Sequence, residues 1–194
     1  LVSSAARRAA IDSVVQAATQ TRDLIESQGL AVALVTGAGT GTMAHEASSG
    51  VCGELQAGSF LFMDADYARN QAAPGQPAFE HALFIATQVM SVQGTHAICD
   101  AGHKSHAIDS GLPLVALRAP GQALAYANGG DEHGILECAD PGATLPALGD
   151  KLWLIPGHCD PTVNLHNALI GVRGGLAHGV VECILRVDAR GALT

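Results

Sequence analysis

A short apolar run at residues 30–35 is followed directly by a glycine-rich segment at residues 36–42. A continuous apolar run of this length, bounded by glycines, is typical of a parallel strand that is buried on both faces. Apolar side chains recur at helical spacing over residues 5–28, which predicts a helix with one buried stripe, and a second helix is predicted over residues 45–52. With another strand predicted within residues 53–64, the order is helix, strand, helix, strand. This order indicates a parallel α/β unit.

The sequence changes character at residues 67–77, a polar stretch that contains Pro74, Gly75 and Pro77. After this stretch, short apolar runs alternate with Gly, Pro, Asp and Asn, which predicts a mainly antiparallel β domain. Its strands are predicted over residues 82–92, 97–99, 114–117, 134–137, 151–155 and 180–187. We therefore expect an α/β unit over residues 1–66, a linker over 67–77 and a β domain over 78–194.

The charge balance limits the kinds of partner that this chain binds. The formal net charge is -8, and the chain has only two lysines, Lys104 and Lys151. Nucleic-acid surfaces and anionic membranes attract basic patches, so we expect neither as a partner. The apolar runs are far shorter than the roughly 20 residues that span a bilayer. Five cysteines without a CxxC pair argue against a disulfide framework and favour the reducing cytoplasm.

Residues 158–160 place three potential metal ligands in consecutive positions. In an extended segment, His158 and Asp160 would share one face while Cys159 points away from it. An imidazole and a carboxylate suit Mn2+, Mg2+ or Zn2+, and two protein ligands leave positions open for water or substrate. The alternative is that His158 is a hydrogen-bonded loop residue close to a proline turn.

The glycine-rich turn at residues 37–42 has two interpretations. Its exposed amides, together with the hydroxyls of Thr40 and Thr42, would form a phosphate cradle at the start of a helix. Glycine and an N-capping threonine also occur in such turns for purely geometric reasons. A dinucleotide-binding oxidoreductase is a minor alternative, because Met43 occupies the position where the short-chain dehydrogenase pattern has its last glycine.

Further polar residues are weaker candidates for a functional role. Asp131, Glu132 and His133 would either contact the metal ligands or form a solvated turn. Thr162 and Asn164 would either orient the ligands or satisfy the turn after Pro161. The cluster of His103, Lys104 and His106 is expected to have a loop role.

Five segments occur together in this sequence: residues 35–42, 54–59, 63–67, 131–134 and 156–165. In this order they resemble the D-threonine aldolase and D-3-hydroxyaspartate aldolase family, which is related to metal-dependent D-serine dehydratases. Members are pyridoxal phosphate (PLP) enzymes of the alanine-racemase-like type, fold type III. The resemblance implies that residues 1–66 are the last part of a (β/α)8 barrel. It implies that residues 78–194 are the C-terminal, D-serine dehydratase-like β domain that carries the metal site.

The resemblance also assigns site residues. It implies that the PLP phosphate is held by Gly37, Gly39, Thr40, Gly58 and Ser59, and that Gln56 faces the pyridine ring. It implies a catalytic divalent metal, Mn2+, Mg2+ or Zn2+, on His158 and Asp160. The related dehydratases look more like HxC at these positions, so Asp160 favours an aldolase.

The implied reaction is a metal-assisted retro-aldol cleavage of a D-3-hydroxy amino acid. D-3-hydroxyaspartate would give glycine and glyoxylate, and D-threonine would give glycine and acetaldehyde. The metal or its water helps to deprotonate the β-hydroxyl, and the pyridine ring accepts the electrons of the broken bond. The alternatives are a dehydratase that acts on D-serine or D-3-hydroxyaspartate, and a non-catalytic remnant.

The family's Schiff-base lysine lies on the first barrel strands, whereas Lys104 and Lys151 both fall in the predicted β domain. We therefore expect that the chain is the C-terminal portion of an aldolase and is inactive alone. The family resemblance implies a homodimer for the full-length protein.

Overall fold

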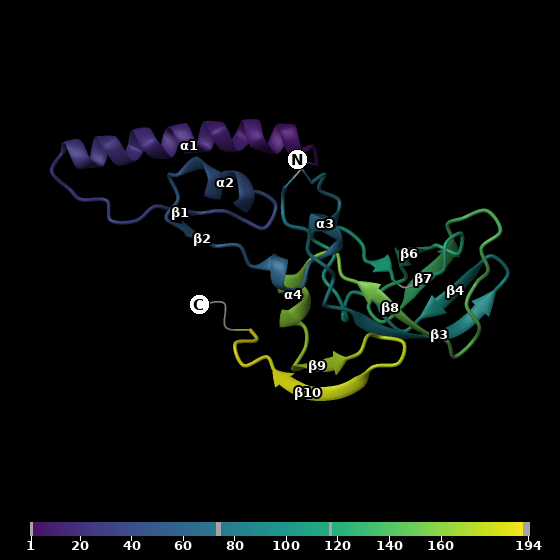
Figure 1. The fold of residues 1–194 in the computed structure, drawn as a ribbon. Coiled ribbons are helices and arrows are strands. Elements are labelled where there is room, and N and C mark those ends of the chain that lie inside the picture. Colours follow the sequence, from purple (N-terminus) through teal and green to yellow (C-terminus); the bar gives the residue numbers. More distant parts are fainter. Residues whose placement is uncertain (1, 73–74, 117, 192–194) are drawn as a thin grey trace. The chain divides into compact units, whose positions relative to one another are not determined.

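The computed structural model describes residues 2–72, 75–116 and 118–191. The chain forms two compact units, Leu1–Ala82 and Leu83–Thr194 (Figure 1). The predicted linker at residues 67–77 lies within the first unit, and its residues 73 and 74 are outside the described residues. None of the described helices is long and apolar enough to cross a membrane.

The first unit begins with the long helix α1, Ser4–Ser27, which confirms the predicted helix. The Ser3 hydroxyl caps its first turn by accepting a hydrogen bond from the Ala6 amide at 3.4 Å. The buried apolar stripe expected on this helix is wrong for much of its length, because Val14 and Leu24 are 54% and 65% exposed.

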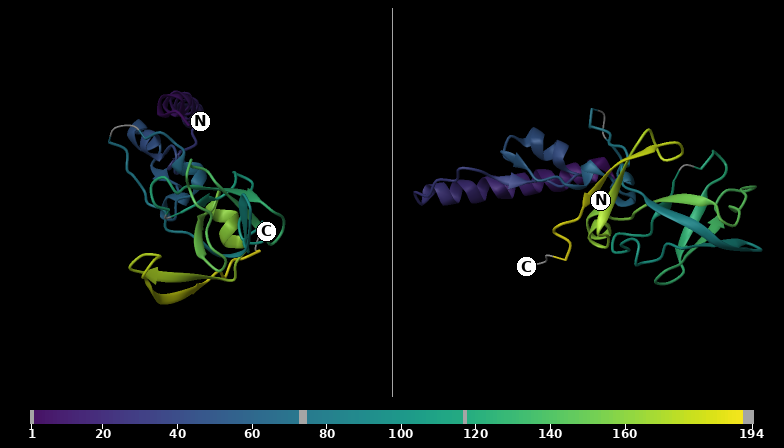
Figure 2. Two further views of the ribbon diagram at one scale, coloured as in Figure 1. Left: turned by 90° about the vertical axis from the view of Figure 1, so that its right-hand side faces the viewer. Right: turned by 90° about the horizontal axis from the view of Figure 1, so that it is seen from below.

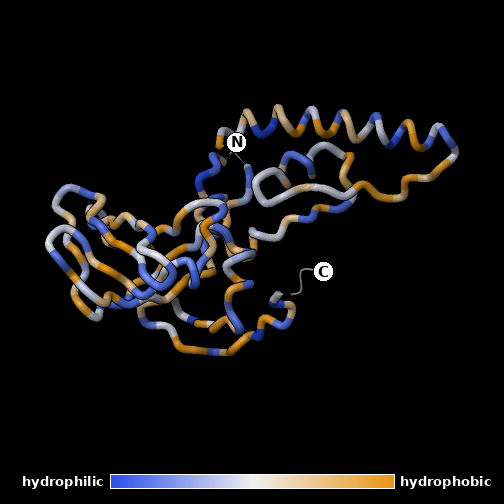
Figure 3. Tube along the Cα trace, turned by 180° about the vertical axis from the view of Figure 1, so that it is seen from behind, coloured by the Kyte–Doolittle hydropathy of each residue, from blue (hydrophilic) through white to orange (hydrophobic). Residues whose placement is uncertain are grey.

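The strand predicted over residues 30–35 is wrong. Strand β1 is Thr36–Gly37, and it pairs in parallel with β2, Glu54–Leu55. The apolar residues before β1 have no regular structure, and Leu30 and Leu34 are 64% and 51% exposed. Figure 3 shows this segment in orange after α1. A strand buried on both faces needs neighbours and two covering layers, and among the described residues β1 pairs with β2 alone.

The strand predicted within residues 53–64 is confirmed only at β2. Helix α2, Met43–Ser49, lies between β1 and β2 in the chain, so the predicted alternation of helices and strands holds. The rest of the predicted strand contains the 3-10 turn η1, Ser59–Leu61, and helix α3, Ala65–Ala68, begins just after it. The run of apolar side chains before Asp64 therefore turns rather than extends.

The second unit contains a six-stranded sheet in which every pairing is antiparallel, as predicted. In spatial order its strands are β5 Leu114–Val115, β8 Lys151–Ile155, β3 Ile85–Gln93, β4 His96–Cys99, β7 Gly134–Cys138 and β6 Leu124–Asn128. The edge strands β5 and β6 contact each other, so the sheet nearly closes on itself. Residue 117, in the strand predicted over 114–117, lies outside the described residues.

Alternate residues of these strands, together with Ala101 just after β4, form the core of the second unit. The core residues are Ile85, Val89, Ala97, Cys99, Ala101, Leu124, Tyr126, Leu136, Leu152 and Leu154. Leu136 and Leu154 are completely buried, and the alternation of buried and exposed residues along β3 is that of a sheet with one face on the core. Burial of this apolar face is the main force that holds the sheet together.

Two further strands form a separate ribbon, β9 Ala168–Arg173 and β10 Val180–Arg186. The predicted strand at residues 180–187 is confirmed as β10, and the pattern missed β9. All seven residues of β10 are exposed, including Val180 at 72% and Ile184 at 66%. Figure 2 shows the ribbon standing apart from the six-stranded sheet of the same unit.

Candidate cofactor and metal sites

The first candidate site lies at the carboxyl ends of β1 and β2. Gly37 is the last residue of β1, and the loop after it carries Gly39 and Thr40. The loop after β2 carries the other proposed cofactor residues, Gln56, Gly58 and Ser59. Because β1 and β2 are parallel neighbours, both loops begin at the same edge, as ligand-binding loops of parallel sheets do. The structure therefore brings the two segments together.

Hydrogen bonds join the two loops directly. The Gln56 amide donates to the Gly37 carbonyl at 2.7 Å, and the Phe60 amide donates to Oγ1 of Thr40 at 3.0 Å. Since Thr40 accepts this bond, its hydroxyl proton can be donated to an anion. A Cβ added at Gly58 would meet no atom within 4 Å, so the backbone there borders open space. A hydroxyl donor and an accessible backbone fit a phosphate group.

Glu46, a residue that the sequence did not single out, braces the first loop from α2. It is only 6% exposed, and its carboxylate accepts hydrogen bonds from the Ala38 amide at 3.0 Å and the Thr42 hydroxyl at 2.7 Å. Ala38 has a positive φ of 77°, a conformation that costs a residue with a side chain about 1–2 kcal/mol. The bond to Glu46 stabilises that conformation. Because the Thr42 hydroxyl donates its proton to Glu46, the role of Thr42 in the cradle stays a prediction.

Arg7 holds the same loop from α1. Its side chain donates to the Gly41 carbonyl at 3.0 Å and to the Gln71 carbonyl at 2.6 Å. Arg7 is 6% exposed. It lies four and seven positions before Ile11 and Val14, in line with the predicted apolar stripe, so its burial fits that pattern, whereas its contacts with the loop could not be predicted from it.

The second candidate site lies at the start of helix α4, Cys159–Asn164, in the second unit. His158 is the N-cap residue of this helix and has an extended backbone. Cys159 is buried, and Asp160 is exposed in the first helical turn. The prediction that residues 158–160 form one extended segment is therefore wrong beyond His158. Because Cys159 is buried, its thiol does not reach the surface, whereas His158 is partly exposed and Asp160 is exposed.

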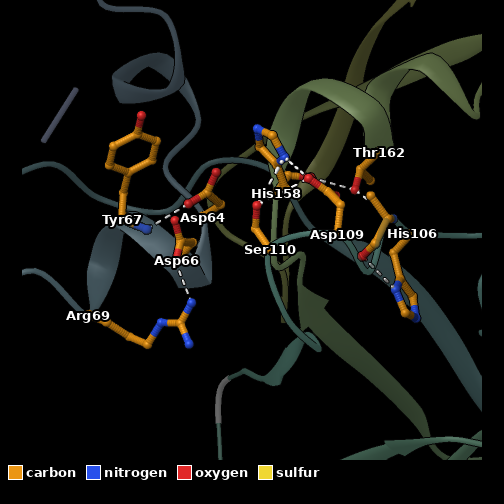
Figure 4. Close-up of polar contacts among 10 residues, drawn as sticks. Asp64, Asp66, Tyr67, Arg69, His106, Asp109, Ser110, His158 and Thr162 are labelled. Carbon is orange, nitrogen blue, oxygen red and sulfur yellow. Dashed lines mark hydrogen bonds and ion pairs between the residues drawn. The ribbon is translucent and has the colours of Figure 1, made fainter. Parts of the chain in front are cut away.

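His158 has a carboxylate partner that the sequence did not predict. Nδ1 of His158 lies 2.6 Å from Oδ2 of Asp109, and the Ser110 hydroxyl lies 3.3 Å from the same nitrogen (Figure 4). The hydrogen bond from His158 lowers the pKa of the Asp109 carboxyl from its ordinary value. Asp109 and His158 are 49 positions apart, so no local pattern could pair them.

Thr162 fixes the backbone of His158. It is 1% exposed, and its hydroxyl donates to the His158 carbonyl at 2.6 Å while it accepts from the Ala107 amide at 3.1 Å. Asn164 instead binds the end of the chain, because its side chain accepts from the Gly191 amide at 2.8 Å. Thr162 therefore holds a candidate ligand, as one of its two interpretations predicted, whereas Asn164 fits neither interpretation, because its side chain binds a segment 27 positions away.

The remaining candidates form two other groups. Lys104 pairs with Glu132 at 2.9 Å, and Asp131 lies 3.8 Å from His103. These pairs join the loop after β4 to the exposed turn between β6 and β7, which also contains His133. His106 lies apart from them in the interior. Among the residues that the structure describes, no group of three or more His, Cys, Asp or Glu side chains is placed to hold a metal ion. A cation on His158 and Asp160 would therefore keep open positions.

Known proteins are similar to this chain along most of its length. Residues 82–172 match the family model described as "Putative serine dehydratase domain". The chain is 44% identical over 190 residues to 3-hydroxy-D-aspartate aldolase of Paracoccus denitrificans (strain Pd 1222), a match that covers 95% of this chain and 46% of that protein. It is 45% identical over 169 residues to D-threonine aldolase of Arthrobacter sp, covering 87% of this chain and 42% of that protein. The chain thus spans slightly less than half the length of these relatives.

Solved structures confirm the predicted fold class, an α/β barrel fragment followed by a mainly antiparallel β domain. D-threonine aldolase from Filomicrobium marinum matches all of this chain and 51% of its own, with a TM-score of 0.91 and 43% identity. A D-threo-3-hydroxyaspartate dehydratase shares the fold at a TM-score of 0.69 and 22% identity, over 94% of this chain and 50% of that one. An alanine-racemase-like protein from Idiomarina loihiensis also shares the fold, with a TM-score of 0.56 and 20% identity, over 77% of this chain and 43% of that one.

The two aldolase names agree with the resemblance carried by the five sequence segments. With 44–46% identity to these relatives along 84–95% of its length, the chain belongs to the family of 3-hydroxy-D-aspartate aldolases and D-threonine aldolases.

Proposed function

We propose that this chain is the C-terminal portion of a PLP- and divalent-cation-dependent aldolase that cleaves a D-3-hydroxy amino acid. The substrate would be D-3-hydroxyaspartate, giving glycine and glyoxylate, or D-threonine, giving glycine and acetaldehyde. The observation that carries the proposal is the near-equal identity, 44–46%, to relatives named for each of these substrates. The chain's two lysines, Lys104 and Lys151, lie in the second unit, so we propose that the Schiff-base lysine lies outside this chain and that the chain alone is inactive.

The loops after β1 and β2 are the proposed PLP site. Thr40 would donate its hydroxyl proton to the phosphate, and the backbone at Gly58 and Ser59 would border it. Gly37 and Gly39 would allow a close approach of the first loop, and Gln56 would face the ring. PLP, when bound, supplies an electron sink for the pair released at Cα.

The start of α4 is the proposed cation site. His158 would bind Mn2+, Mg2+ or Zn2+ through an imidazole nitrogen, and Asp160 through its exposed carboxylate. A divalent cation there would lower the pKa of the substrate's β-hydroxyl, from whose ionised form the Cα–Cβ bond breaks. The two protein ligands leave positions for that oxygen.

The test is release of glyoxylate or acetaldehyde by the full-length protein from D-3-hydroxyaspartate and from D-threonine, with added Mn2+ and with EDTA. We expect release that EDTA abolishes and that is lost in His158→Ala and Asp160→Ala. His178→Ala is the matched control, because His178 is an exposed histidine of the same unit. It should retain the wild-type rate.

A dehydratase is the second candidate, because residues 82–172 match a serine dehydratase model and a dehydratase shares the fold. Ammonia and a 2-oxo acid as products, in place of glycine and an aldehyde, would establish it. Absence of every product from folded, PLP-loaded protein would favour a non-catalytic remnant. We also propose a homodimer for the full-length protein, which light scattering would detect as twice the mass of one chain.

A further inference from the structure

The loop between β4 and β5 is fixed against the start of α4. The Ala107 amide donates to the buried Thr162 hydroxyl at 3.1 Å. On the other side of Asp109, the loop backbone approaches Gly157 so closely that an added Cβ would lie 2.1 Å from the Gly111 carbonyl oxygen. Two contacts, one on each side of Asp109 in the sequence, therefore hold this residue in place.

The partner of Nδ1 determines which nitrogen of His158 carries the proton. A neutral imidazole has one N–H donor and one acceptor nitrogen. Asp109 offers only acceptor oxygens when it is ionised, and its Oδ2 lies 2.6 Å from Nδ1. Nδ1 must therefore be the donor. The Ser110 hydroxyl also donates to Asp109, at 3.1 Å, and so helps to keep Oδ2 in position.

The same bond leaves the other nitrogen as the acceptor. With the proton on Nδ1, the lone pair of the neutral ring is on Nε2, which is the atom that a cation would bind. The His158 side chain is 29% exposed, so its ring is partly open to solvent. A carboxylate on the far nitrogen also makes an imidazole a more basic ligand.

We propose that Asp109 is a positioning residue that holds Nδ1–H of His158 and thereby presents Nε2 to the divalent cation. This inference rests on the proposed function, whose cation site it extends by a residue that does not itself bind the metal. Ser110 supports Asp109, and Thr162 fixes the His158 backbone. The three contacts together set both the position and the tautomer of the ring.

Metal binding tests the inference without reference to activity. Mn2+ would be titrated into the metal-free, full-length protein, and the electron paramagnetic resonance signal of free Mn2+ would report the affinity. Asp109→Asn should weaken Mn2+ binding by about 10–100-fold, because the amide can donate to Nδ1 and move the ring proton to Nε2. Asp131→Asn is the matched control, since Asp131 lies 3.8 Å from a different histidine on an exposed turn. It should bind Mn2+ like the wild type.

The tautomer of His158 can be measured without metal. Replacing a residue with a merely structural role would not change it. Proton–nitrogen correlation spectra of histidine-labelled protein distinguish Nδ1–H from Nε2–H rings. The His158 signal, assigned by its loss in His158→Ala, should show Nδ1–H in the wild type and in Asp131→Asn. It should lose that form in Asp109→Asn, while circular dichroism shows an unchanged fold.

Failure of this inference is distinguishable from failure of the proposed function. If Asp109→Asn binds Mn2+ as tightly as the wild type while His158→Ala does not, Asp109 has no positioning role and the cation site stands. An Nε2–H ring in the wild type would also overturn the inference. If His158→Ala binds Mn2+ normally, or the wild type binds none, the cation part of the proposed function falls together with the inference.

Discussion

Nε2 of His106 lies 2.9 Å from the phenolic oxygen of Tyr126 in the interior of the second unit. The Tyr126 hydroxyl donates its only proton to the Ala101 carbonyl at 2.7 Å, so its oxygen accepts the bond from His106. The two rings meet edge to face, with centroids 5.2 Å apart. This pair anchors the loop after β4, the same loop that brings Asp109 to His158.

Tyr126 should ionise only at strongly alkaline pH. Burial raises the pKa of its hydroxyl to about 12. The chain has two tyrosines, so a spectrophotometric titration of the folded chain should show one group that titrates at about pH 12. That step should disappear in Tyr126→Phe and remain in Tyr67→Phe. Two tyrosines that both titrate at the ordinary value near 10 would contradict the burial of Tyr126.

His106 should make the second unit less stable in mild acid. Burial lowers the pKa of its imidazole below the ordinary 6.5. As the pH falls below 6.5, the unfolded chain takes up a proton that the folded chain does not, so the free energy of unfolding decreases. The loss is at most about 1.4 kcal/mol for each pH unit, and it ends below the folded-state pKa.

The measurement is urea unfolding of the wild type and His106→Gln at about pH 7 and about pH 5, which bracket the ordinary histidine pKa. The variant should be less stable at the higher pH but should lose less stability on acidification. His178→Gln, which replaces an exposed histidine, should behave like the wild type. Equal acid losses in wild type and His106→Gln would show that His106 is not the group responsible.

Gly157→Ala should destabilise the second unit through the contact with Gly111. The added Cβ would lie 2.1 Å from a backbone oxygen, so the chain must move, at a cost of about 1–3 kcal/mol. Gly58→Ala is the control for stability, because the same methyl group there meets no atom within 4 Å. Urea midpoints would measure both changes. Equal midpoints for Gly157→Ala and the wild type would mean that the two loops are not in close contact.

The sequence predicted the β domain well because its signal is local. In β3 and β8 short apolar runs marked the strands, and burial alternates along them, as a sheet with one buried face requires. The signal failed at β6, where the small Ala125 and Ala127 weaken the strand pattern. It also failed at residues 30–35. An apolar run indicates that a segment favours burial, but it does not show whether a neighbouring strand is present to pair with it.

The candidate sites show the same limit. His158 and Thr40 lie in short sequence motifs, so both could be predicted as site residues from the sequence alone. Their supporting residues come from distant segments: Asp109 lies 49 positions from His158, and Arg7 lies 34 positions from Gly41. Such pairs are created by the fold, and only the structure brings them together.

Residue 160 should set which cation the proposed site prefers. A carboxylate is a hard ligand that suits Mn2+ and Mg2+, whereas a thiolate is soft and favours Zn2+. Asp160 is exposed in the first turn of α4, so a cysteine there would present its thiolate from the same place without repacking the core. Asp160→Cys should therefore shift the preference from Mn2+ toward Zn2+ by at least about tenfold. Competition titrations on the metal-free, full-length protein would measure this shift.

Asp160→Asn separates ligand chemistry from loss of charge. The amide oxygen is a weaker, neutral ligand, so this variant should bind both Mn2+ and Zn2+ less tightly and gain no preference for Zn2+. A shift toward Zn2+ in Asp160→Cys alone would mean that the side chain at position 160 touches the metal. If the two variants instead keep the wild-type affinity for both metals, Asp160 is not a ligand, and the cation is held by His158 with groups outside this pair.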